Sequence, residues 1–180
     1  MAMFARDLSV AHYRSFDSYR LVLDDGVTVL AGPNAAGKTN LIEALQLLTS
    51  GASFRHPTAA ELVHDGVGSC RVQLRLEGDG RVLDMGLSVE DGKRSFSRNG
   101  KKCSAAGVRG VLPSVLFCPD HLDTVKRGAS VRRAALDDFG VQLSARYADL
   151  ASAYGRCVTQ RNALLKESWC CREMLGAWNE

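Results

Sequence analysis

The residues best suited to chemistry lie in one short segment, AGPNAAGKTN, at positions 31–40. Gly32, Gly37, Lys38 and Thr39 have the spacing of a phosphate-binding loop. In such a loop the backbone N–H groups point inward and form a concave anion site, which the positive end of the following helix reinforces. Glycines let the backbone approach phosphates without a clash from Cβ. The segment therefore predicts a nucleotide-binding site.

Within this loop we expect Lys38 to neutralise the β and γ phosphates of ATP and the Thr39 hydroxyl to ligate Mg²⁺. The full set of candidate nucleotide-binding positions is Gly32, Pro33, Asn34, Ala35, Ala36, Gly37, Lys38, Thr39 and Asn40. A carboxylate and a residue that positions the attacking water must come from elsewhere. The alternative is a glycine-rich turn before a core helix, which needs no ligand.

Two elements must position this loop, a strand before it and a helix after it. The apolar run 27–31 predicts the strand, and the apolar spacing in residues 38–50 predicts the helix, with Gly51 as its stop. Residues 3–31 as a whole predict two or three short strands, with a turn at Asp25 and Gly26.

The segment after the helix predicts an antiparallel meander. Residues 71–103 alternate apolar and polar side chains, and Asp79-Gly80, Asp91-Gly92 and Asn99-Gly100 interrupt them. Such dipeptides supply the positive φ angles of tight hairpin turns. The residues expected on the buried face are Val72, Leu74, Leu76, Leu83, Met85, Leu87 and Val89. The run 111–117 predicts one more short strand, buried on both faces.

From Ser130 onward the pattern becomes helical. Leu143, Tyr147, Leu150, Tyr154 and Cys157 follow one another at spacings of four and three, which predicts an amphipathic helix. Whether it forms an antiparallel helical arm or packs on its own domain stays open. We expect an ATP-binding part at residues 1–128 and an incomplete helical lobe at 129–180.

Composition favours a globular protein. The chain has 180 residues, 46% of them hydrophobic and 24% charged, with no apolar run long enough to span a membrane and no signal peptide. We therefore expect a cytoplasmic protein. The six cysteines fit no metal pattern, so we expect them to be reduced and mostly buried.

Charge is distributed unevenly along the chain. Residues 93–133 contain ten basic and two acidic residues, a net charge of +8, which leaves −5 on the rest of a chain of net charge +3. A basic segment of this kind fits a polyanion such as DNA, although solvated hairpin and helix faces would look the same.

The order of elements narrows the class of phosphate-loop protein. Small-molecule kinases and GTPases continue as alternating strands and helices on a parallel sheet. An antiparallel meander followed by helices instead favours an ATPase head with an antiparallel lobe ahead of a helical lobe.

Several segments together resemble the RecF recombination-repair proteins, within the SMC-like branch of ABC-type ATPases. They are HYRSF (12–16), GPNAAGKTN (32–40), EAL-LLTSGASFR (43–55), ELVHDG (61–66), RNGKK (98–102), VLFCPDHLDTVKRG (115–128), RRAALDD (132–138) and QRNALLK (160–166). Each is weak outside the glycine loop, but their order covers nearly the whole chain. The fold implied is an α/β phosphate-loop ATPase head with a mixed sheet, an antiparallel β lobe and the start of a helical lobe.

The resemblance implies an ATP-dependent homodimer that binds DNA at gaps or junctions between single and double strands. With RecR, and with RecO in the same pathway, such a protein helps to load RecA. Carried over by position, Arg14 lies near the nucleotide and Asp120 senses Mg²⁺ or water. Asp120 could equally begin a helix after Pro119.

The resemblance also implies DNA contacts. Arg55 stands where related heads carry an arginine linked to DNA sensing, and Arg98, Lys101 and Lys102 are further candidates within the basic segment. Ordinary surface positions are the alternative for all four. Arg132 and Arg133 could contact phosphates or pair with acidic residues of the same helix.

Three departures from the family, Ala35, Ala129 and Ala135, look tolerable. A larger one is that no acidic Walker B strand and no signature motif occur, so we expect a fragment that holds the Walker A half and does not turn ATP over alone. The other readings are an ATPase head of another SMC-like family in phage defence or transport, a phosphate-loop enzyme for a small molecule, and a nucleotide-binding module without catalysis.

Overall fold

The structure is a computed structural model that describes residues 3–119, 126 and 128–166. The chain divides into two compact units, Met1–Phe117 and Cys118–Glu180. Each unit is described by itself. The functional boundary expected after residue 128 stays a prediction.

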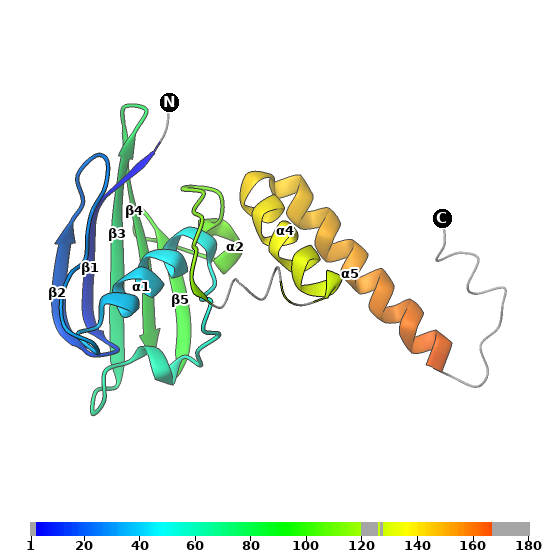
Figure 1. Cartoon of the computed structure of the whole chain (residues 1–180), viewed down its shortest axis with the longest axis horizontal. Helices are drawn as coiled ribbons and strands as arrows, with labels where there is room; N and C mark the ends of the chain where they lie inside the picture. Colours follow the sequence, from blue (N-terminus) through cyan, green and yellow to red (C-terminus); the bar gives the residue numbers. More distant parts are fainter. Residues whose placement is uncertain (1–2, 120–125, 127, 167–180) are drawn as a thin grey trace. The chain divides into compact units, whose positions relative to one another are not determined.

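The first unit contains a six-stranded sheet in the order β2-β1-β3-β4-β5-β6 (Figure 1). Every neighbouring pair is antiparallel. The strands are β1 (Phe4–Tyr13), β2 (Phe16–Val22), β3 (Ser69–Gly78), β4 (Arg81–Glu90), β5 (Lys93–Arg98) and β6 (Lys101–Cys103). The predicted meander is confirmed, and all three predicted hairpin dipeptides have positive φ at both residues.

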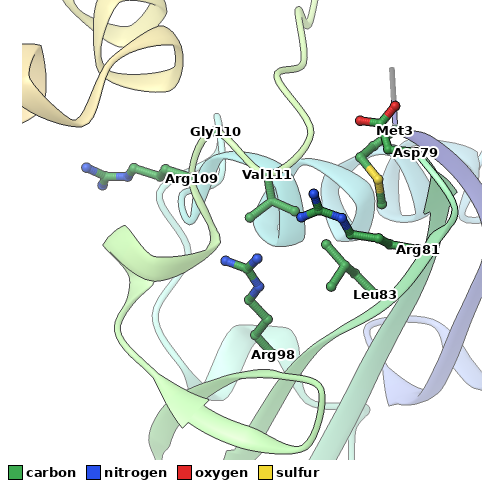
Figure 2. A pocket seen from close by; sticks show the side chains of 8 residues that line it. All are labelled: Met3, Asp79, Arg81, Leu83, Arg98, Arg109, Gly110 and Val111. Carbon is green, nitrogen blue, oxygen red and sulfur yellow. The ribbon is translucent and has the colours of Figure 1, made fainter. Parts of the chain in front are cut away.

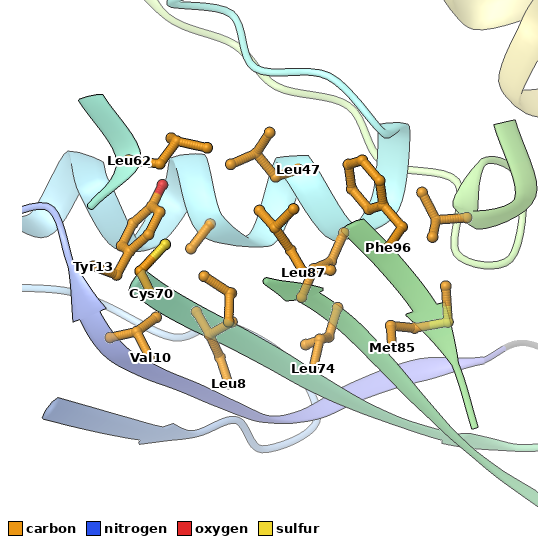
Figure 3. Packing of buried hydrophobic residues seen from close by; sticks show 14 of the residues in the cluster. Leu8, Val10, Tyr13, Leu47, Leu62, Cys70, Leu74, Met85, Leu87 and Phe96 are labelled. Carbon is orange, nitrogen blue, oxygen red and sulfur yellow. The ribbon is translucent and has the colours of Figure 1, made fainter. Parts of the chain in front are cut away.

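One face of this sheet forms the core (Figure 3). Helix α1 (Lys38–Ser50), the 3-10 helix η1 (Ala60–Leu62) and the short helix α2 (Ala105–Val108) contribute Leu47, Leu62 and Val108 to it. The meander residues predicted to face inward are fully buried except Leu83, which is partly buried. The strict period of two thus placed one apolar face against the helices. Gly51 ends α1 in the left-handed conformation, as predicted.

Two strand predictions are wrong. Residues 27–31 and 111–117 form no strand, and Val27, Val29 and Phe117 are 92%, 80% and 82% exposed. A strand needs a neighbour to satisfy its backbone groups, and no described strand pairs with either run. The described sheet therefore lacks a parallel component.

The chain first reverses at a position that the prediction did not name, Arg14 and Ser15, between β1 and β2. The turn predicted at Asp25 and Gly26 coincides with a bend there, and Gly26 has a φ of 99°. Arg14 takes a left-handed φ of 52°. Its backbone N–H donates to the Leu62 carbonyl and its own carbonyl accepts from His64 Nδ1, so contacts distant in sequence hold this turn.

The second unit contains α4 (Ala129–Leu143) and α5 (Ala145–Lys166), which pack on each other. The apolar series that predicted one helix is divided between the two, because Ser144 has extended backbone angles. Leu143 and Tyr154 stay strongly exposed. Among the described cysteines Cys70 is buried, Cys103 and Cys118 are partly buried and Cys157 is exposed. Cys170 and Cys171 lie outside the described residues, so the prediction of mostly buried thiols stays open for the chain.

Candidate nucleotide site

The phosphate loop leads directly into α1, whose N-terminus has no side-chain cap. The first N–H groups of a helix have no acceptor within the helix, so those of Lys38 and Thr39 remain available for an anion. Gly37 precedes them in the left-handed conformation, with φ 87°. Ala35 also has a positive φ, 65°, so this departure from the family is accommodated at the cost of some strain.

Lys38 folds back over the loop. Its Nζ donates hydrogen bonds to the carbonyl oxygens of Gly32 and Pro33, at 2.8 and 2.6 Å. The ammonium group is therefore held against its own loop, where a bound phosphate would meet a positive charge. Thr39 is exposed at the first turn of α1, so its hydroxyl can reach a ligand.

The β1–β2 turn supports the loop from behind. A Cβ at Gly37 would lie 2.5 Å from the Phe16 ring and 2.8 Å from Ser15 Oγ. Asn40 Nδ2 donates to the same Ser15 hydroxyl at 3.0 Å. The loop is thus packed so closely on this turn that position 37 accepts only glycine.

A buried carboxylate lies one turn further along α1. Glu43 is fully buried and accepts two hydrogen bonds from Arg14, from Nε at 3.1 Å and from Nη2 at 2.9 Å. Ser53 Oγ donates to Glu43 Oε1 at 2.6 Å, and Arg55 Nη1 lies 3.5 Å from Oε2. Such a fork arrangement is among the stronger polar contacts in proteins.

Arg55 links this carboxylate to the loop. Its Nη1 also donates to Asn40 Oδ1 at 2.9 Å, and Asn40 in turn contacts Ser15. A continuous chain of polar contacts therefore runs from Glu43 through Arg55 and Asn40 to the turn behind Gly37. Arg55 is 38% exposed at its side chain, so one edge of its guanidinium group remains open to solvent.

The electrostatic effects at this site follow from burial. Burial strongly raises the pKa of the Tyr13 hydroxyl, and the negative charge of Glu43 raises it further. Partial burial acts to lower the pKa of Arg14, but the hydrogen bonds to Glu43 and its negative charge together outweigh it, so the pKa is raised overall. At neutral pH, Tyr13 is therefore neutral and Arg14 carries its charge.

The predicted site residues separate into three groups. The loop residues, Arg14 and Arg55 gather around the start of α1, although the guanidinium group of Arg14 is engaged by Glu43. Arg98, Lys101 and Lys102 lie exposed at the β5–β6 hairpin. Asp120 lies outside the described residues.

Glu43 and Ser53 are the functional candidates that sequence reasoning missed. The available signal was a carboxylate beside Ala44 on the buried stripe of α1, since charged residues are rarely fully buried unless paired. The described residues contain no group of three or more acidic, histidine or cysteine side chains that could hold a metal ion. Nor does any described helix have the length and apolar character to cross a membrane.

Comparisons with known proteins agree with this geometry. The sequence pattern of the AAA domain family matches residues 7–110. The DNA replication and repair protein RecF of Pseudarthrobacter chlorophenolicus is 36% identical over 92% of this chain, and the aligned part is 42% of that protein. The RecF of Paenarthrobacter aurescens has the same identity and coverage. The chain thus spans less than half the length of these relatives.

Solved structures give the same result. The recombination mediator protein RecF-ATPrS of the RecFOR pathway superposes with a TM-score of 0.85 at 28% identity, covering 98% of this chain and 49% of that one. The RecF-ATP structure gives a TM-score of 0.83 at the same identity and coverage. The predicted phosphate-loop ATPase fold is confirmed by its likeness to these RecF structures. The chain belongs to the AAA domain family, and its relatives are RecF proteins, of which it spans less than half the length.

Proposed function

We propose that this chain is the nucleotide-binding half of an ATP-dependent DNA-binding protein of recombinational repair and replication. It would act in the bacterial cytoplasm at gaps or junctions between single and double strands, as a homodimer, and assist RecA loading with RecR and RecO. The observation that carries the proposal is the phosphate loop itself, an uncapped helix start with the Lys38 ammonium group held against the loop.

The residues of the loop fit ATP and Mg²⁺. Backbone N–H groups and Lys38 would hold the β and γ phosphates, and the exposed Thr39 hydroxyl would supply one ligand to the metal. The bound Mg²⁺ would neutralise charge on the phosphates. The loop supplies neither a carboxylate for the metal nor a residue that positions the attacking water, so we expect binding without measurable turnover by this chain alone.

Nucleotide binding by the chain tests the first half of the proposal. Fluorescent ATP should bind the wild type in the presence of Mg²⁺, and Lys38→Ala should weaken binding by at least tenfold. Lys126→Ala removes the same charge from a position outside the loop and should leave binding unchanged. Equal affinities of Lys38→Ala and the wild type would refute the assigned role of the loop.

Gapped DNA tests the second half. The affinity should rise when ATP is present, and the slope of log affinity against log salt should become less steep when Arg98, Lys101 and Lys102 are all neutralised. An unchanged slope would show that these residues are solvated surface positions. Sedimentation with and without ATP measures the proposed homodimer directly.

A further inference from the structure

A cavity of about 310 Å³ lies at the end of α1 opposite the phosphate loop (Figure 2). Arg81, Arg98 and Arg109 line it together with Asp79, so these four side chains carry a net charge of +2. Arg109 Nε donates to the carbonyl of Ser50, the last residue of α1, at 2.9 Å. Since 13 residues of helix span about 20 Å, the cavity is separate from the nucleotide site.

The two strand arginines face the helix side of the sheet. On β4 the inward residues from Met85 to Val89 are all buried and apolar, and Leu83 and then Arg81 continue the same face towards the turn. On β5 the buried Phe96 is followed two positions later by Arg98. Figure 2 shows both guanidinium groups reaching toward the space beside Val111.

No described hydrogen bond or ion pair joins either guanidinium group to an acceptor. A second cavity, of about 400 Å³ on the outward face of the sheet, provides the contrast. There Arg20 pairs with Asp7 at 2.6 Å and Arg75 with Asp84 at 3.7 Å. Arginines of the same sheet are thus neutralised at one cavity and left available at the other.

We propose that the cavity of Arg81 and Arg98 binds a backbone phosphate of DNA. The planar guanidinium fork matches phosphate oxygens and can bond them in pairs. Arg109 adds a third positive charge at the rim. The DNA source of the phosphate rests on the proposed function, whereas the anion site itself does not.

Inorganic phosphate tests the anion site. The probe is titrated into the chain carrying Lys38→Ala, which impairs the phosphate loop, and the side-chain Nε–Hε signals of the arginines are followed by NMR. The Arg81 and Arg98 signals should shift with saturation, while those of Arg20 and Arg75 should not. Arg98→Lys keeps the charge but removes the fork, so it should weaken phosphate binding several-fold. The absence of saturable shifts at Arg81 and Arg98 would overturn the site.

Gapped DNA then tests the source of the phosphate. Arg81→Gln/Arg98→Gln should reduce the salt slope of DNA affinity by about one to two. The control Arg20→Gln/Arg75→Gln removes the same charge from the outward cavity and should change the slope much less. Equal changes in the two variants would overturn the proposal in favour of overall charge. If the wild type binds phosphate at the site but no DNA, the proposed function fails and free phosphate replaces DNA as the ligand.

Discussion

Removing the charge of Glu43 tests whether the buried polar network holds the first unit together. In Glu43→Gln the side chain keeps its size, but its amide NH₂ cannot accept the second hydrogen bond from Arg14. This NH₂ group also meets the donor groups of Arg55 and Ser53 in place of a carboxylate oxygen. Two partly buried guanidinium groups would then face a neutral side chain.

The expected loss of unfolding free energy follows from how deeply the partners of Glu43 are buried. Breaking a fully buried ion pair by removing one partner costs about 3–5 kcal/mol. Glu43 is fully buried but the Arg14 side chain is 19% exposed, so solvent recovers part of this loss. We expect about 2–4 kcal/mol, which corresponds to roughly a 30- to 900-fold change in an equilibrium constant.

Hydrogen exchange of the α1 amides is the appropriate measurement, since it reports the stability of the first unit alone. Exchange of these amides in Glu43→Gln should be roughly 30- to 900-fold faster than in the wild type. The control Arg20→Gln breaks an exposed pair, in which Arg20 is 72% exposed, and should cost less than about 1 kcal/mol.

A double variant separates lost charge from lost packing. Arg14→Met/Glu43→Leu removes both main charges and should recover much of the stability, because paired apolar replacements are often neutral. If Glu43→Gln exchanges within fivefold of the wild type and of Arg20→Gln, the network contributes no more than a surface pair and the reasoning is wrong.

Three further outcomes follow from single positions. Gly37→Ala should abolish nucleotide binding, since its φ of 87° and a ring atom 2.5 Å from the added Cβ both exclude a side chain; fluorescent ATP measures this. Gly140→Ala should displace the Tyr147 ring, which lies 2.5 Å from the new Cβ. In the wild type a hydrogen bond to Asp137 of α4 raises the pKa of Tyr147, so the displacement should lower this pKa, and ultraviolet titration detects the shift. Burial raises the pKa of the Cys70 thiol, so at pH 8 this thiol holds less thiolate than an ordinary one. It should therefore react with iodoacetamide much more slowly than the exposed Cys157, and its rate should rise as the pH increases. Equal rates for the two thiols by mass spectrometry would contradict this.

Local signals in the sequence were sufficient for part of the fold. Helix α1 and the β3–β4–β5 hairpins follow from apolar spacing and turn dipeptides, because residues only a few positions apart determine both. The predictions that failed concern residues 27–31 and 111–117, and the β1–β2 turn was not predicted. Each depends on a partner distant in the chain, which apolar runs alone do not specify.

The candidate site shows the same division. The sequence by itself determined the phosphate loop and the class of ligand it fits, because nine consecutive residues carry that chemistry. Only the tertiary structure showed that Glu43 engages Arg14 and connects to Arg55, since these residues come from three separate segments. The convergence of Arg81 and Arg98 likewise depends on the register of two strands. A charge is assigned from sequence, but its partner, and therefore its availability to a ligand, is decided by packing.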